Sequence, residues 1–281
     1  MMITRQFQIF LASILFMASV CGAQEFSIYT RVYEESDGKV AKNPICRSHT
    51  ILHANRGYDF ISELGQVTIS DFGSRRVTVL HGSRKLATSF SFDDLEQQIE
   101  KAHQSAEKFL KEPIQQTGFN TELASDFIRF QLQPEFQEVY DSDRKYLTLT
   151  SDILTYEASC APPPAAKTLD TYLRFTDWTA QVNYVLISQA MLPGPRLQLN
   201  RVLKSKEVLP VQIVLTMHIG RGVKLRAEHQ YQWELEKTER QMIHDWDTQL
   251  ENPTTKYVSL KEFQEILIQE QRTATRPTTT R

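Results

Sequence analysis

Side chains alternate between apolar and polar along residues 211–235, and this pattern constrains the fold more than any other feature. Because successive side chains of a β-strand point to opposite faces of a sheet, it indicates strands with one face toward an interior and one toward water. The apolar positions, with His229 as the polar exception, are Val211, Ile213, Leu215, Met217, Ile219, Leu225, Ala227, Tyr231, Trp233 and Leu235. Gly220-Arg221-Gly222 separates the two runs, so the pattern predicts a C-terminal β-hairpin.

The N-terminal part predicts a meander of short strands. Turn residues such as Ser36-Asp37-Gly38 and Phe72-Gly73-Ser74 separate them. Such short connections favour antiparallel pairing, because parallel strands need long crossovers. The predicted strands are Phe26–Tyr33, Ile45–His53, Gly57–Ser62, Gln66–Asp71, Arg75–His81, Lys85–Phe90, Phe127–Leu132, Tyr146–Thr150 and Ile153–Glu157.

Four helices are expected between and after these strands. They extend from the Ser91 cap to Pro113, over Leu169–Ala190, from a cap at Thr238 and from a cap at Ser259. The sequence therefore predicts an α+β fold, in which a curved antiparallel β-meander packs against several helices and ends in a C-terminal hairpin.

Residues 1–23 have the composition of a signal peptide. Arg5 gives a short positive start, Ile9–Ala18 form an apolar run too short for a membrane span, and small residues precede Ala23. We therefore expect cleavage after Ala23 and export to the periplasm or the extracellular space. Two alternatives remain open: acylation of Cys21, as in a lipoprotein, and retention of the segment as an uncleaved anchor. No later segment of the sequence is apolar enough to span a bilayer.

Residues 24–272 are expected to form a single α+β domain. The proline-rich connector Ala161–Ala166 offers an alternative sub-boundary at 161–167. We favour one unit, because the apolar face of the hairpin must cover something larger than itself. Residues 273–281 are polar and without periodicity, and are expected to form a disordered tail.

Two cysteines, Cys46 and Cys160, would remain after signal cleavage. An oxidising compartment favours joining them in a disulfide that fastens the connector to the meander. The alternatives are two buried free thiols, or a nucleophilic Cys46 served by His49 or His53.

Composition and motifs exclude several classes of function. The chain has 32 Lys and Arg against 34 Asp and Glu, so it lacks the basic excess of a general nucleic-acid binder. It contains no glycine-rich nucleotide loop, no Gly-x-Ser-x-Gly elbow and no His-Glu-x-x-His motif. His49 and His53 would share a strand face, but no third ligand follows at a diagnostic spacing. The sequence therefore predicts no catalytic, cofactor or metal residues.

His229 is the most informative single residue, because it lies on the apolar face of the best predicted strand. Its ordinary interpretation is a core histidine bonded to a buried polar group. The alternative is that it lines a pocket between the sheet and the helices, together with Trp178, Tyr231 and Trp233. In either case we expect Trp233 on a buried sheet face.

The segments Gly57–Ile61 and Gln66–Asp71 give the meander a similarity to the half-barrel of periplasmic lipoprotein carriers. The resemblance covers residues 26–160 and implies an open, curved antiparallel sheet, closed by helices, that holds acyl chains in an apolar cavity. It assigns no ligand residue to this chain. The segments Thr176-Asp177-Trp178 and Pro195-Arg196-Leu197 resemble those of uncharacterised exported bacterial proteins, a similarity that implies no activity.

Two hypotheses of different class follow. The first is an exported, non-catalytic envelope protein that binds an apolar ligand, such as a lipid, or another envelope protein on its curved sheet. The second is a hydrolase or transferase whose site is assembled from distant residues and includes His229 or His49. The enzyme hypothesis predicts a histidine with a carboxylate partner facing a polar cleft.

Overall fold

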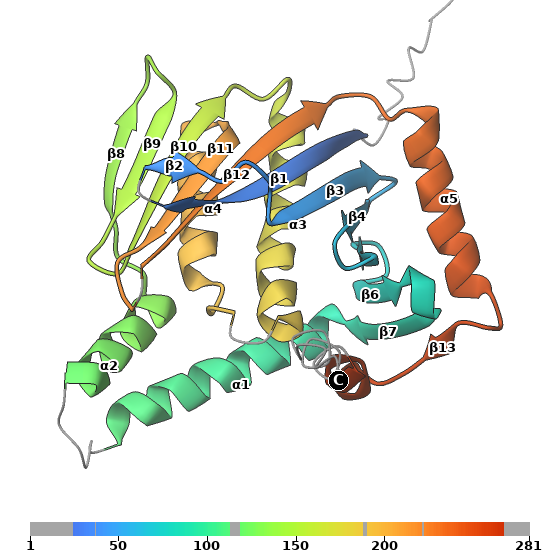
Figure 1. Cartoon of the computed structure of the whole chain (residues 1–281), viewed down its shortest axis with the longest axis horizontal. Coiled ribbons are helices and arrows are strands. Elements are labelled where there is room, and N and C mark those ends of the chain that lie inside the picture. The colour runs from blue at the N-terminus through green and yellow to red at the C-terminus, as the bar shows by residue number, and fades with distance from the viewer. Residues whose placement is uncertain (1–24, 37, 113–118, 188–189, 221, 267–281) are drawn as a thin grey trace, which may run out of the picture.

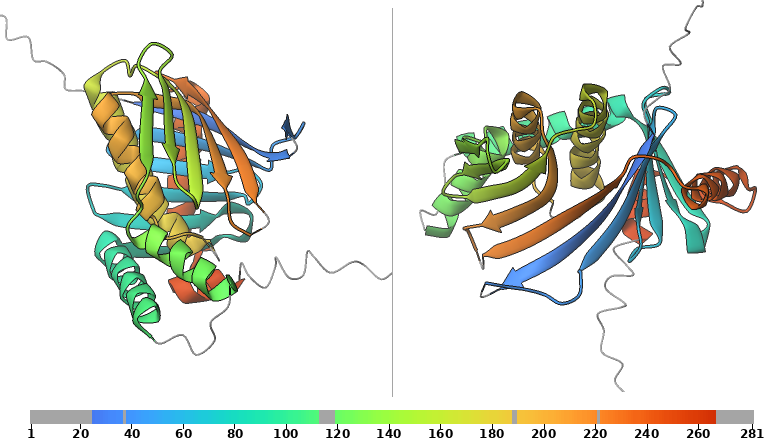
Figure 2. Two further views of the ribbon diagram at one scale, coloured as in Figure 1. Left: turned by 90° about the vertical axis from the view of Figure 1, so that its left-hand side faces the viewer. Right: turned by 90° about the horizontal axis from the view of Figure 1, so that it is seen from above.

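The computed structural model describes residues 25–36, 38–112, 119–187, 190–220 and 222–266. The expected signal segment 1–23 and the tail 273–281 lie outside the described residues. Thirteen strands in the described part form one large curved, unclosed sheet (Figures 1 and 2). The strands are β1 (Phe26–Ser36), β2 (Lys39–Val40), β3 (Cys46–His53), β4 (Arg56–Ile61), β5 (Gln66–Asp71), β6 (Arg76–His81), β7 (Leu86–Ser91), β8 (Gln137–Asp141), β9 (Tyr146–Thr150), β10 (Leu154–Ala161), β11 (Leu209–Met217), β12 (Val223–Gln232) and β13 (Lys256–Tyr257).

The strand order places β1, the first strand, beside β12 of the C-terminal hairpin in the middle of the sheet. The order is β13-β7-β6-β5-β4-β3-β1-β12-β11-β10-β9-β8, with β2 paired to β1. All described neighbours are antiparallel except β13 and β7, so the sheet is mixed. β1 and β12 pair over eight residues on each strand, from Ser27 opposite Gln232 to Glu34 opposite Leu225. The N-terminal meander and the C-terminal hairpin therefore share one hydrogen-bonded sheet.

Five α-helices and a 3-10 turn accompany the sheet in the described residues. They are α1 (Phe92–Lys111), α2 (Phe119–Leu132), α3 (Ala166–Leu186), α4 (Gly194–Lys206), α5 (Lys237–Glu251) and the turn Gly82–Arg84. Residues 260–266 are also helical. Helices α3 and α4 lie in the hollow of the curved sheet, and α5 lies against its opposite face (Figure 2). The expected Ser91 cap is present: the Asp94 amide donates to the Ser91 hydroxyl at 3.0 Å, and the Ser91 amide donates to the Asp94 carboxylate at 2.9 Å.

Apolar side chains fill both sides of the sheet. The core in the hollow includes Phe26, Leu147, Leu149, Leu169, Leu173, Leu199 and Leu203. A second core joins β6 and β7 to α1 and α3, and a third lies under α5. Gly57 on β4 lets α3 approach closely, because a Cβ at that position would overlap the ring of Phe175. The sheet and α3 are therefore in direct contact along one side of the hollow.

The predicted α+β fold and hairpin are confirmed, with several differences in detail, which include the unpredicted short strands β2 and β13. The expected strand Phe127–Leu132 is wrong, because this segment belongs to α2. Helix α4 and strand β8 were not predicted. The expectation that Trp233 is buried is also wrong: it follows the last residue of β12 and is 41% exposed.

Candidate ligand cavities

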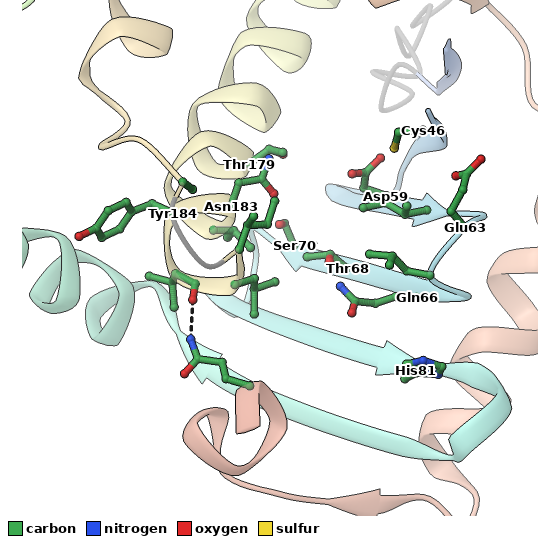
Figure 3. Close-up of a pocket in the computed structure, with 18 of the residues that line it drawn as sticks. Cys46, Asp59, Glu63, Gln66, Thr68, Ser70, His81, Thr179, Asn183 and Tyr184 are labelled. Atoms are coloured by element: carbon green, nitrogen blue, oxygen red, sulfur yellow. Dashed lines mark hydrogen bonds between the residues drawn. The ribbon is translucent and has the colours of Figure 1, made fainter. Parts of the chain in front are cut away.

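A large cavity lies between the hollow face of the sheet and the helices that cross it. Its volume is about 1220 Å³, and its walls come from β3 to β6 on one side and from α1, α3 and residue 264 on the other. In Figure 3, Asp59, Thr68 and Ser70 on the strands lie opposite Thr179 and Asn183 on α3. The cavity therefore exists because helices span a curved sheet without filling its hollow.

Alternation along β5 explains how one strand supplies both a cavity wall and a core. Gln66, Thr68 and Ser70 line the cavity, whereas Val67 and Ile69 are buried in the core under α5. Because side chains alternate between the two faces, a polar row and an apolar row come from consecutive residues. The sheet wall of the cavity is consequently rich in polar groups.

The helical wall and the opening are more apolar. Val182 and Leu186 of α3 line the cavity. Three further lining residues, Ile45, Leu64 and Ile187, are 53%, 47% and 52% exposed. Large apolar side chains that are both exposed and part of a cavity wall mark an apolar rim at its mouth.

Asp59 is the main ionisable group on the sheet wall. The Thr50 hydroxyl donates to its carboxylate at 2.8 Å. Burial raises the pKa of Asp59, and the hydroxyl bonds from Thr50 and Ser48 partly oppose this shift because they favour the charged form. The wall therefore carries a carboxyl group whose protonated form is favoured by its surroundings.

The smaller cavity lies beside the larger one, under the middle of the sheet. Its volume is about 420 Å³, and Asn183 of α3 lines both cavities. Most of its wall is apolar, with Val32 from β1, Ile213 from β11 and Ala227 from β12. Its polar side chains include Arg196, from the first turn of α4, and His229.

His229 is held neutral at the wall of the smaller cavity. Its Nδ1 lies 2.9 Å from the Thr30 hydroxyl on the neighbouring strand β1. Burial lowers the pKa of His229 to about 3, and the nearby positive charge of Arg196 acts in the same direction. Its Nε2 is buried and has no hydrogen-bond partner among the described residues.

One of the four residues expected to line a pocket does so. His229 lines the smaller cavity. Trp178 instead stacks on Phe92 with ring centroids 3.8 Å apart, and Tyr231 donates its hydroxyl to the Pro210 carbonyl at 2.8 Å. Trp233 stacks on Tyr231 at the end of the strand. Arg196 and Asn183 were missed as lining residues; Pro195-Arg196-Leu197 had been noted only for its resemblance to exported proteins.

The expected disulfide is wrong, since Cys46 and Cys160 are free thiols. They lie on β3 and β10, and β1, β12 and β11 separate these strands. Four strand spacings of about 4.8 Å place them roughly 19 Å apart, far beyond the ~7 Å limit between the Cα atoms of a disulfide. Burial raises the pKa of both thiols, that of Cys160 to about 12, which disfavours a nucleophilic Cys46.

A histidine–carboxylate pair is present, but it lies outside both cavities. His49 Nε2 is 2.9 Å from the Glu239 carboxylate. The other oxygen of Glu239 accepts the Glu236 amide at 2.7 Å and so caps α5. Neither side chain is among the described residues that line the cavities. The pair joins β3 to the start of α5.

The described part of the chain holds no group of three or more His, Cys, Asp and Glu residues placed to bind a metal ion. None of its helices is both long enough and apolar enough to cross a bilayer. No protein-family model matches the chain, and no curated protein matches its sequence.

Proposed function

We propose that this is an exported, non-catalytic envelope protein that holds an apolar chain between its curved sheet and the helices in its hollow. The observation that carries this proposal is the larger cavity of about 1220 Å³, whose mouth is rimmed by Ile45, Leu64 and Ile187. Its size is at the upper end of ligand cavities in proteins, which run to roughly 1,000 Å³. Export is inferred from residues 1–23.

An acyl or alkyl chain fits the chemistry of this cavity. Burying a methylene group contributes about 0.8 kcal/mol, so a ten-carbon chain contributes about 8 kcal/mol before the cost of immobilising the ligand is subtracted. The apolar rim would meet such a chain first, and Val182 and Leu186 would contact it inside. The polar side chains on β5 are compatible with a lipid that carries polar groups as well as with an unsubstituted alkyl chain.

The hydrolase or transferase alternative has weaker support. A histidine with a carboxylate partner exists in His49 and Glu239, but the pair lies under α5 and Glu239 also caps that helix. His229 lines a cavity but has no carboxylate partner among its described hydrogen bonds. A binding protein is therefore the function that the geometry supports best.

Titration with primary alcohols of eight, ten and twelve carbons tests the proposal. We expect the Kd to fall about fourfold for each added methylene, the equivalent of ~0.8 kcal/mol. Thr68→Trp should weaken binding at least tenfold, because Thr68 points into the cavity. The matched control is Thr148→Trp: Thr148 lies between the core residues Leu147 and Leu149 on β9, so its side chain faces away from the hollow. Absence of alcohol binding, or equal effects of the two substitutions, would overturn the proposal.

A further inference from the structure

Resting on this proposed function, we infer that the smaller cavity is a head-group site for a long-chain carboxylate, whose anion is bound by the Arg196 guanidinium and the His229 imidazole. The chain would extend past Asn183, which lines both cavities, into the larger one. This assigns a ligand class, an anionic single-chain amphiphile, to a cavity whose remaining wall is largely apolar.

Arg196 is a cation without a carboxylate partner. Its described hydrogen bond is a long one, from Nη2 to the Tyr172 hydroxyl at 3.4 Å, and no ion pair of Arg196 occurs among the described residues. Burial raises the pKa of Asp177, and the charge of Arg196 only partly opposes this shift; the Asp177 carboxylate accepts the Asn200 amide at 2.7 Å and forms no ion pair with Arg196 among the described residues. A guanidinium presents a fork of donors that matches a carboxylate, so this side chain is suited to bind one.

His229 supplies a second donor at the same wall. When the Thr30 hydroxyl donates to Nδ1, the proton of the neutral ring is on Nε2, and this buried Nε2–H has no partner. A buried polar group without a hydrogen bond costs about 1–3 kcal/mol, so native structures rarely leave one unpaired. Arg196 and His229 line the same small cavity, so both donors face one enclosed space. One carboxylate could accept from both.

The charges of the two cavities place the anion in the smaller one. No Asp or Glu is found among the described residues that line the smaller cavity, so Arg196 gives it a positive wall. The wall of the larger cavity carries both signs of charge, because Glu63 lies there with Arg84 and Lys101, and it also holds the carboxyl group of Asp59. An anionic head group is therefore favoured beside Arg196, and an uncharged chain is suited to the larger space.

Comparison of dodecanoate with dodecanol, both below their micelle or solubility limits, tests this site. The two share a chain and differ in the charged head group. We expect the wild-type protein to bind dodecanoate at least tenfold more tightly. Arg196→Gln should abolish that preference while leaving dodecanol binding within about twofold. The control is Arg201→Gln, an exposed arginine on the same helix, which should keep the preference.

A second variant keeps the proposal testable if Arg196→Gln fails to fold. His229→Asn retains an amide that can bond Thr30 but removes the Nε2 donor, and it should reduce the preference for dodecanoate by about threefold or more. Equal wild-type binding of dodecanoate and dodecanol would overturn the head-group site and leave the chain-binding proposal standing. So would folded Arg196 and His229 variants that keep the full preference. If neither compound binds the wild-type protein, both proposals fail.

Discussion

The imidazole of His229 stays neutral because its surroundings exclude water and present a positive charge. Its pKa is about 3 in the folded protein, compared with roughly 6.5 for an exposed histidine. Protonation therefore favours the unfolded chain at every pH between these values. The contribution of this residue to stability is fully present above pH ~6.5 and is lost as the pH falls toward ~3.

The pH dependence of unfolding tests this environment. Between about pH 6 and pH 4, the free energy of unfolding of the wild-type protein should fall more steeply than that of His229→Asn, by up to ~1.4 kcal/mol per pH unit. Urea denaturation at half-unit intervals measures the two slopes. All other ionisable residues are common to both proteins, so their contributions cancel in the comparison. Parallel slopes would mean that His229 is accessible to water in the folded state.

At the scale of elements, the chain's strands were easier to predict than its helices. Alternating side chains and turn residues gave the positions of β3 to β7 within one or two residues. The six-residue run Phe127–Leu132 is too short for its apolar pattern to separate a strand from a helix, and it belongs to α2. Helix α4 begins among prolines, with Pro193 as its N-cap residue and Pro195 in its first turn, because the first turn of a helix tolerates proline.

Half of the candidate site could not be predicted, because it lies on α4, which the sequence did not predict. Arg196 reaches the smaller cavity only because α4 starts beside it, so without that helix the residue had no predicted location. His229 was found because a polar residue interrupted an apolar face. Strand order, in contrast, cannot be derived from periodicity, and this is why Cys46 and Cys160 were expected to meet. A long loop between two thiols is compatible with many sheet orders.

The sheet order predicts that both thiols stay reduced in the folded protein, even under oxidising conditions. With β1, β12 and β11 between their strands, Cys46 and Cys160 cannot pair without disrupting the sheet. Alkylation after denaturation without reductant, followed by digestion, should label both residues completely. The midpoint of thermal unfolding should be unchanged by reductant. Recovery of a peptide that links the two cysteines would contradict the strand order.

At the scale of the whole molecule, β1 and β12 join the first and last parts of the chain. β1 has β12 on one side and β3 on the other, so it holds the meander and the hairpin in one sheet. The core in the hollow likewise combines Phe26 with residues of β9, α3 and α4. A sheet and a core shared in this way favour a single cooperative unit that includes the residues on both sides of the proline-rich connector.

Proline substitution at the centre and at the edge of the sheet tests that cooperativity. Arg31 is in β1 and its side chain is 42% exposed, so Arg31→Pro mainly removes a backbone donor from the middle of the sheet. We expect it to lower the free energy of unfolding by about 3 kcal/mol, in a single transition seen equally by circular dichroism and tryptophan fluorescence. Glu138→Pro, at an exposed residue of the edge strand β8 whose backbone amide points away from β9, should cost about 1 kcal/mol or less. Arg31→Ala controls for the 3.6 Å ion pair with Glu228, which is too exposed to contribute much.

Two separate transitions, with only one shifted by Arg31→Pro, would show that the meander and the hairpin fold independently despite their shared strands.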